Sequence, residues 1–470
     1  LGWLLPAVTS TFDWFLLLAG NIFVLVAIGI LVSPLGKVRL GGRDATPDFS
    51  YGGWFAMLFA AGMGIGLMFY GVAEPLGHFS AAVAPDAGTP ESWAPLDGAP
   101  GDVAEAWRLA MAATIFHWGL HPWAIYAVVA LSLALFAYNK GLPLSMRSIF
   151  YPIFGERVWG WTGHIIDTLA VFATLFGLAT SLGLGAEQAN AGLEYLFGFP
   201  EGDTSKVLLV IGITAIALGS VVAGVDKGVR RLSELNLVVA LVLFLFVVAV
   251  GPTLAIFSGF FRNVVSYLEY FPALANPFNR TDTNFSQGWT AFYWAWWISW
   301  SPFVGMFIAR VSRGRTVREF LFAVLLVPSL VSVLWMTAMG GTAINQFVNQ
   351  GYEAAVNAPL ELQLFRMLEI LPLAEITSFV GIVLVIVFFV TSSDSGSLVI
   401  DTITAGGKTN APVSQRIFWA SFEGLVAIAL LLGGGLAALQ AAAVSTGLPF
   451  AVVLLLGCWG LIKGLMHEPR

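Results

Sequence analysis

Long apolar stretches recur along the whole chain, separated by short segments rich in glycine, proline and charged residues. Each stretch is near the roughly 20 residues that a helix needs to cross the hydrocarbon of a bilayer. The pattern therefore predicts an all-α, polytopic membrane protein. Eleven spans are expected, near residues 13–33, 52–73, 109–137, 164–190, 207–225, 234–256, 288–309, 320–344, 373–400, 417–437 and 440–462.

Composition agrees with this pattern and excludes several classes of protein. Of the 470 residues, 58% are hydrophobic and 11% are charged, whereas soluble domains carry about 25% charged residues. Because so few charges cannot cover a soluble surface, a secreted, nuclear or cytosolic enzyme is excluded. The net charge of -6 comes without a basic stripe, so no nucleic-acid partner is expected. No hydrolase or ATP-binding motif occurs, so the chain is not expected to be an enzyme or an ATP-driven pump.

Positive charge is distributed unevenly between alternate loops. Of the 22 Lys and Arg residues, 17 fall in loops on one predicted side, and the other side holds only Arg108, Lys206, Arg262, Arg280 and Arg366. Positive charge accumulates in cytoplasmic loops. The C-terminus is therefore predicted to be cytoplasmic, in a multi-pass membrane protein.

Two spans contain residues that interrupt membrane helices. The second has Gly62, Gly64 and Gly66 at alternate positions, and the seventh has Pro302 next to a run of tryptophans. Interrupted helices at matching places in two halves indicate a transporter built from an inverted repeat. The predicted organisation is a peripheral helix and loop (1–51), repeat one (52–256), an outer segment (257–287), repeat two (288–463) and a short cytoplasmic end (464–470). The outer segment fits an interfacial amphipathic helix or an ordered loop equally well.

Aromatic residues cluster in two spans and offer two interpretations. Trp296, Trp297 and Trp300 share a helix face, as do Trp118, Trp123 and Tyr126. Such residues can anchor a helix at the membrane interface. Their faces can also form a cage for a quaternary ammonium group. No acid lies within either cluster, which favours a substrate that carries its own negative charge. Backbone N–H groups of the 62–66 break would face that charge.

A cluster of hydroxyl residues, 391–397, ends the ninth span. Its oxygens suit sodium, although such hydroxyls often bond to carbonyls of their own helix. Within it, Asp394 is expected to pack or orient the helix rather than to contact an ion. His117 and His121 lie one turn apart, but no third ligand is evident, so a metal site is not predicted there.

Four runs resemble the betaine/choline/carnitine transporter family, most closely its sodium-coupled glycine betaine symporters. They are AAGMGIGLMFYGVAEP (60–75), HWGLHPWAIY (117–126), FYWAWWISWSPFVGMFIARVSRGRTVREF (292–320) and FFVTSSDSGS (388–397). The resemblance implies a leucine-transporter-type fold of five plus five helices, a homotrimer, and twelve spans. The first of these twelve is expected to be absent or truncated here, where the sequence begins at Leu1. It implies no cofactor other than sodium as the coupling ion.

By this resemblance, each group of site residues has an expected role. The betaine cage would be Trp118, Trp123, Tyr126, Trp296, Trp297 and Trp300, with Ala61, Met63 and Ser181 close to the substrate. Substrate selectivity would depend on Gly62, Gly64 and Gly66. Choline carriers of the family tend to have Asp at the position of Gly66, so glycine there favours a zwitterion. One sodium site would use Ala60, Met63, Phe388, Thr391 and Ser392.

A second sodium site of the family would use Thr174 and Phe303. This chain has Leu178 where a further hydroxyl is expected, so the second site is expected to be weakened or absent. With this resemblance, the predicted function is secondary active transport: sodium-coupled uptake of glycine betaine by alternating access, across the inner membrane of a bacterial cell. The alternatives are a carrier of choline, carnitine, ectoine or a sulfonium osmolyte, with proton coupling or as an antiporter, and more distantly an ion channel.

Overall fold

The computed structural model describes residues 3–223, 226–408 and 412–469. Residues 1, 2 and 470, at the two ends of the predicted organisation, lie outside the described residues. The described part is helical and has no β-strand, only a single bridge between Arg39 and Thr316. The long helices are α1 (Leu4–Val32), α2 (Tyr51–Gly62), α3 (Ile65–Val83), α4 (Val103–Trp118), α5 (Leu120–Ala134), α7 (Trp161–Phe197), α8 (Asp203–Ala223), α9 (Asp226–Val250), α10 (Thr253–Leu274), α12 (Ala291–Val311), α13 (Val317–Gln350), α16 (Ala374–Thr404) and α17 (Val413–Met466).

Helices cover the described part of each of the eleven predicted spans; residues 224 and 225, at the end of the fifth span, lie outside the described residues. Within the described ranges, eight helical segments are long and apolar enough to cross a membrane, and the bent pair α2 and α3 adds a ninth. α12 covers a further predicted span. The last two spans are both in α17, where the backbone breaks at Gly434 and Gly435. Short helices α6 (Tyr151–Phe154), α11 (Thr283–Phe285), α14 (Ala354–Asn357) and α15 (Gln363–Glu369) lie in the connections.

The glycine-rich second span is a broken helix. α2 ends at Gly62, and α3 starts at Ile65 after a bend of 62°. Met63 and Gly64 are extended, with φ/ψ of -93°/132° and -174°/-174°. An interruption of this kind leaves backbone groups without helical partners in mid-membrane, which is tolerated where they line a cavity or are buried in protein.

The predicted interruption of the seventh span is wrong. α12 runs without a break from Ala291 to Val311 and includes Pro302. A proline leaves the carbonyl four residues earlier without its usual N–H partner. Here the Ser301 hydroxyl donates to that carbonyl, on Ile298, at 2.7 Å. This side chain supplies the missing hydrogen bond, and the helix continues through the proline.

A second break was not expected. The predicted span 109–137 is divided into α4 and α5 at Gly119, whose φ/ψ are -99° and -120°. A Cβ at Gly119 would lie 2.7 Å from the Ile115 carbonyl oxygen, so this backbone path requires glycine. The break places Trp118 at the end of one helix and Trp123 in the first turns of the next.

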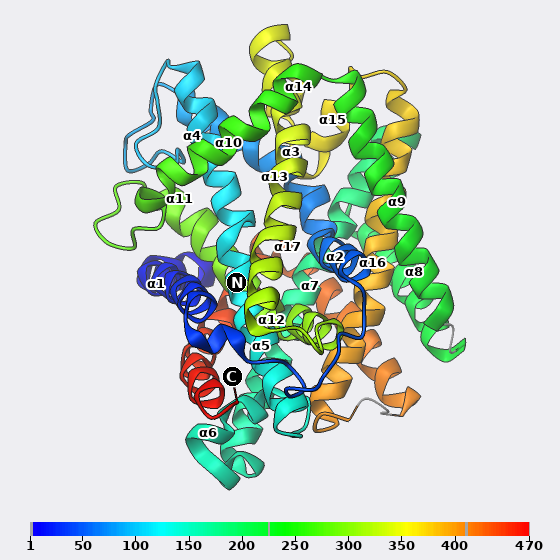
Figure 1. Cartoon of the computed structure of the whole chain (residues 1–470). Helices are drawn as coiled ribbons and strands as arrows, with labels where there is room; N and C mark the ends of the chain where they lie inside the picture. Colours follow the sequence, from blue (N-terminus) through cyan, green and yellow to red (C-terminus); the bar gives the residue numbers. More distant parts are fainter. Residues whose placement is uncertain (1–2, 224–225, 409–411, 470) are drawn as a thin grey trace.

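α12 and α7 lie at the centre of the molecule (Figure 1). α12 packs against α5, α7 and α17, and α7 packs against α16 and α17. α8 and α9 form one side of the molecule and α1 lies on the other. The outer segment 257–287 begins within α10, a helix that packs on α4 and α13. α10 exposes an apolar stripe of Leu254, Phe257, Phe261, Val265 and Leu268.

Replacing Ser301 by alanine is expected to destabilise the protein by about 1 kcal/mol, because the Ile298 carbonyl loses its hydrogen bond in a buried helix. In a Pro302→Ala background the restored N–H takes over this carbonyl, so Ser301→Ala should then have little effect. Thermal unfolding of the four purified proteins measures this difference. Equal losses in both backgrounds would contradict the assignment.

Candidate functional site: a cavity at the helix break

A cavity of about 920 Å³ lies at the break between α2 and α3. Its wall includes residues of α2, α3, α5, α7, α12 and α16. The structure thus brings together nearly all the predicted site residues: Ala60, Ala61, Gly62, Met63, Gly64, Gly66, Trp118, Trp123, Tyr126, Ser181, Trp296, Trp297, Trp300, Phe303, Phe388, Thr391 and Ser392. Thr174 and Leu178 do not line it.

The six predicted cage residues form one aromatic wall. Trp296 and Trp297 are stacked with ring centroids 4.7 Å apart. Trp118 stands edge-on to Trp297 at 4.9 Å, and Tyr126 lies 6.3 Å from Trp297. Trp123 is edge-on to Tyr126 at 5.3 Å. Aromatic residues from three helices therefore line a common space.

Hydrogen bonds at the indole edges hold these rings in place. Trp300 and Trp296 donate to the Gly177 carbonyl of α7, at 2.9 and 3.4 Å. Trp297 donates to the His117 carbonyl at 2.9 Å. Because their polar edges are satisfied by the protein, these tryptophans can offer their ring surfaces to a ligand.

The three glycines of the break meet different surroundings. A Cβ at Gly66 would lie 2.8 Å from Trp118 Cη2 and 3.2 Å from Trp296 Cη2. At Gly62 the nearest atom would be Pro328 Cβ at 3.3 Å, and at Gly64 nothing lies within 4 Å. Of the three, Gly66 is therefore the one whose missing side chain makes room for the aromatic wall.

The break offers opposite partial charges to the cavity. α3 starts at Gly64 without a side-chain cap, and Gly64, Ile65, Gly66 and Leu67 line the cavity. The first N–H groups of a helix lack intrahelical partners and favour an anion. The last carbonyls of α2 have the opposite polarity and favour a cation.

Hydroxyl groups of α16 line the same cavity as the end of α2. Thr391 donates to the Val387 carbonyl at 3.0 Å, which leaves its oxygen lone pairs available. Ser392 lies beside it on the wall, together with Phe388, Ala60 and Met63. Hydroxyl and carbonyl oxygens are hard ligands suited to sodium, so the predicted first sodium set fits the ion in its chemistry.

The predicted second sodium site, Thr174 and Phe303, is less suited to binding the ion than the first. Thr174 is fully buried and donates to the Ala170 carbonyl of its own helix at 2.7 Å. Leu178 fills the space next to Gly396, where a Cβ would come within 2.4 Å of its side chain. Phe303 is on the cavity wall, but Thr174 is not.

One end of the cavity is lined by charged residues. Arg310, Asp394 and Arg416 are on its wall, and Arg416 Nη2 lies 3.3 Å from Asp394 Oδ1. The ion pair agrees with a packing role for Asp394. All the arginines here belong to the loops and helix ends predicted to be cytoplasmic.

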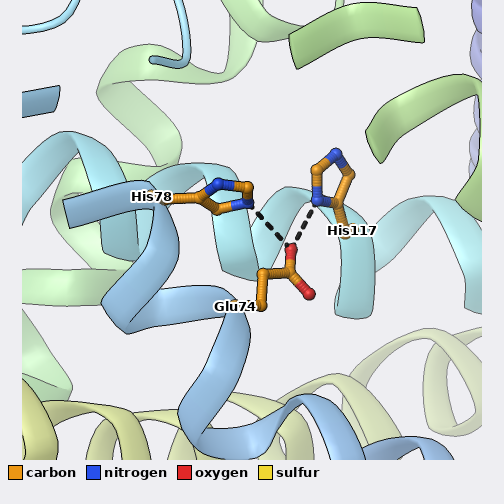
Figure 2. A group of neighbouring side chains, drawn as sticks. All are labelled: Glu74, His78 and His117. Atoms are coloured by element: carbon orange, nitrogen blue, oxygen red, sulfur yellow. Dashed lines mark hydrogen bonds and ion pairs between the residues drawn. The ribbon is translucent and has the colours of Figure 1, made fainter. Parts of the chain in front are cut away.

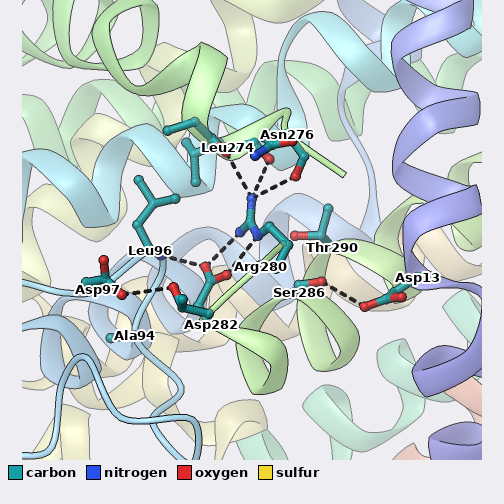
Figure 3. Close-up of polar contacts among 12 residues, drawn as sticks. Asp13, Ala94, Leu96, Asp97, Leu274, Asn276, Arg280, Asp282, Ser286 and Thr290 are labelled. Carbon is teal, nitrogen blue, oxygen red and sulfur yellow. Dashed lines mark hydrogen bonds and ion pairs between the residues drawn. The ribbon is translucent and has the colours of Figure 1, made fainter. Parts of the chain in front are cut away.

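Two connecting segments, 94–97 and 274–282, are joined by an ion-paired network (Figure 3). Both oxygens of Asp282 accept from the Arg280 guanidinium at 2.7 Å, and the Leu96 N–H adds a third bond at 2.6 Å. Arg280 also donates to the carbonyls of Leu274 and Ala273, at the end of α10. These bonds fasten the segments 94–97 and 274–282 together.

Glu74 was missed by the sequence analysis, although it is adjacent to the aromatic wall. It is fully buried on α3 and accepts from the Trp118 indole N–H at 2.6 Å. His78 and His117 also bond to it (Figure 2). His121 takes no part in this group and bonds to Asn21 instead. A lone acid within an apolar span is the signal that points to such a residue.

The model of the betaine/carnitine/choline family of transporters matches residues 2–470. The chain belongs to this family. It is 67% identical to a glycine betaine/proline/choline transporter of Vibrio parahaemolyticus, over 98% of this chain and 84% of the relative. It is 46% identical to a glycine betaine transporter of Acinetobacter baylyi, over 97% and 68%. It is thus a multi-pass secondary transporter.

A solved structure supports the fold class independently. A sodium-coupled sialic acid symporter aligns over 97% of this chain and 86% of its own, with a TM-score of 0.51 at 12% identity. This likeness concerns the fold alone. The expected leucine-transporter-type fold is confirmed.

Gly66→Ala is expected to weaken binding of glycine betaine by roughly tenfold, because the added Cβ displaces Trp118 or Trp296, a change of about 1.4 kcal/mol. Gly64→Ala is the matched control and should bind within about twofold of the parent, since the space there is open. Titration of tryptophan fluorescence with the ligand measures both. Equal losses in the two variants would contradict the contact argument.

Proposed function

We propose that this family member imports glycine betaine together with sodium across the bacterial inner membrane by alternating access. The observation that carries the proposal is one cavity that joins an aromatic wall, the free start of α3 and the hydroxyl face of α16. The aromatic wall suits the ammonium group of glycine betaine, the start of α3 suits its carboxylate, and the hydroxyls suit the sodium ion. Two relatives named as glycine betaine transporters support the choice of cargo.

A zwitterion suits the distribution of charge in the cavity. Its trimethylammonium group would lie against the tryptophan faces, where a desolvated cation–π contact contributes roughly 0.5–2 kcal/mol. Its carboxylate would face the N–H groups at the start of α3. In the described part of the chain, Asp394 is the one carboxylate on the cavity wall, and it already pairs with Arg416.

Sodium would bind between the end of α2 and the hydroxyls Thr391 and Ser392. Because the α2–α3 break contributes to both sites, the ion and the zwitterion would stabilise the same arrangement of the two helices. Each would then raise the affinity of the other by an equal factor. We propose a single coupling sodium, since Thr174 does not line the cavity and Leu178 offers no oxygen.

The conformation corresponds to an inward-facing state in this proposal. The cavity extends to Arg310 and Arg416, on the side that the distribution of Lys and Arg assigns to the cytoplasm. The Arg280–Asp282 ion pair precedes the start of α12, whereas Arg310 is in its last turn, and neither residue of the pair lines the cavity. A cytoplasmic C-terminus follows from the same assignment, and the homotrimer remains a prediction.

The other substrates remain competing proposals. Relatives are named for choline, proline and ectoine as well as glycine betaine. Choline lacks a carboxylate, and the choline carriers of the family tend to have Asp at position 66. In this chain an Asp at position 66 would collide with the Trp118 ring where it now lies, so the arrangement is less suited to choline. Carnitine, ectoine and sulfonium compounds are alternative substrates, and proton coupling and exchange are alternative mechanisms. The liposome uptake experiment below tests them. An ion channel would show flux that does not saturate.

Purified protein in liposomes is expected to accumulate labelled glycine betaine above equilibrium when sodium is higher outside, and not when potassium replaces sodium. The physical reason is that the sodium gradient is the available driving force. Sodium-independent exchange would contradict symport. Uptake of ectoine or choline without uptake of glycine betaine would contradict the proposed cargo.

Ser392→Ala is expected to raise the sodium concentration for half-maximal uptake roughly tenfold, because one oxygen ligand is lost at a cost of about 1.4 kcal/mol. Thr174→Val should change it by less than about twofold. The sodium dependence of uptake, with a Hill coefficient near 1 in the parent, measures both. A large effect of Thr174→Val, or a coefficient near 2, would contradict the single-sodium proposal.

A further inference from the structure

Glu74 has none of the site roles assigned above, and it lies at the centre of a buried polar group. One carboxylate oxygen is 2.6 Å from His117 Nδ1 and 3.2 Å from His78 Nε2. The other oxygen accepts from the Trp118 indole at 2.6 Å and from the Tyr293 hydroxyl at 2.5 Å. Figure 2 shows both histidines directed at the same oxygen.

Burial makes these four contacts interdependent. Glu74 and His117 are fully buried and His78 is 1% exposed, within the membrane-spanning part of the protein. A buried carboxylate is costly unless donors satisfy its oxygens, and it can accept about four hydrogen bonds. The four contacts therefore use the full hydrogen-bonding capacity of the carboxylate. Because all four side chains bond to the same carboxylate, it fixes their positions relative to one another.

Two of the four donors belong to the aromatic wall or support it. Trp118 lines the cavity and stands edge-on to Trp297. Tyr293 lies behind the wall and stacks on Trp297, with centroids 5.6 Å apart and planes 23° apart. The His117 carbonyl accepts from the Trp297 indole, and its Nε2 bonds to Thr290 at 2.9 Å. The group therefore joins α3, α4 and α12 directly behind the wall.

We propose that Glu74 is a positioning residue for the cation cage: through hydrogen bonds to Trp118 and Tyr293 it fixes the aromatic wall that receives the quaternary ammonium group. This inference rests on the proposed function and deepens it. Glu74 does not touch the ligand itself, because Trp118 lies between the carboxylate and the cavity.

The same bond also affects the strength of the cage. An indole that donates to a carboxylate is polarised, and electron density on its ring increases. A more negative ring face attracts a cation more strongly. Glu74 would thus supply negative character to a wall that contains no acid, while remaining sealed from the solute.

A metal ion is not the better occupant of this group. The ligand atoms of Glu74, His78 and His117 lie within 4.8 Å of one another, which a metal site also requires. However, the oxygen shared by the two histidines lies at hydrogen-bond distance from both, 2.6 Å from His117 Nδ1 and 3.2 Å from His78 Nε2, and the second oxygen accepts from Trp118 and Tyr293. The hydrogen-bonded network already satisfies the carboxylate without an ion.

The test compares Glu74→Leu and Glu74→Gln with Glu423→Gln. Leucine removes both acceptor oxygens, whereas glutamine keeps one acceptor and removes the charge. Glu423 is also fully buried, and neither of its oxygens has a hydrogen-bond partner among the described residues. It does not line the cavity, so it controls for the loss of a buried acid elsewhere in the membrane.

Two readouts are needed. The first is the nuclear magnetic resonance of the indole N–H of Trp118 in ¹⁵N-tryptophan protein without substrate, assigned with Trp118→Phe. The parent should show a strongly downfield proton that moves upfield in Glu74→Leu. The second is the KM for glycine betaine uptake, expected to rise roughly tenfold in Glu74→Leu and several-fold in Glu74→Gln, with kcat changed less. Glu423→Gln should leave both unchanged.

The proposal is overturned if Glu74→Leu leaves the Trp118 resonance and KM unchanged, or if Glu423→Gln alters both to the same extent. If Glu74→Leu does not fold, Tyr293→Phe replaces it, because this variant removes one donor and keeps the ring. It should shift the Trp118 resonance and raise KM by a smaller factor, and no change would overturn the proposal. The resonance is measured without glycine betaine. If the parent protein transports another solute instead, the proposed cargo is wrong, but the effect of Glu74 on Trp118 can still be tested.

Discussion

In hydrocarbon, every backbone N–H and C=O must find a partner inside the protein, and the functional site depends on the place where this chain leaves some unpaired. Met63 and Gly64 interrupt the second span, and the cavity surrounds the interruption. At Pro302, by contrast, the Ser301 hydroxyl repairs the helix. One break therefore supplies both the amides and the carbonyls that can receive opposite charges.

The aromatic wall is arranged around the same break. Gly66 allows the rings of Trp118 and Trp296 to approach the start of α3. The Gly177 carbonyl holds two indoles from the side of α7, and Glu74 holds Trp118 from behind. The indoles line the cavity while their polar edges are satisfied in the protein. Recognition of a cation by such a wall needs rigid rings, because each contact contributes only about 0.5–2 kcal/mol.

The sequence predicted those site residues that lie close together along the chain. The dense tryptophans of α12 and the glycines of the second span are visible because their spacing is short, and both line the cavity. Glu74 was missed because, apart from His78 one turn away, its partners His117, Trp118 and Tyr293 are 43, 44 and 219 residues away. The break at Pro302 was wrongly predicted, since a proline alone does not reveal whether a neighbouring hydroxyl replaces its hydrogen bond.

The most direct test of the account compares the affinity of glycine betaine with that of 3,3-dimethylbutanoate, in which carbon replaces the ammonium nitrogen. Shape and carboxylate are nearly the same, and only the positive charge is lost. Calorimetric titration in sodium should show at least tenfold weaker binding of the carbon compound, because its tert-butyl group gains no cation–π attraction. Equal affinities would contradict a cage that recognises charge.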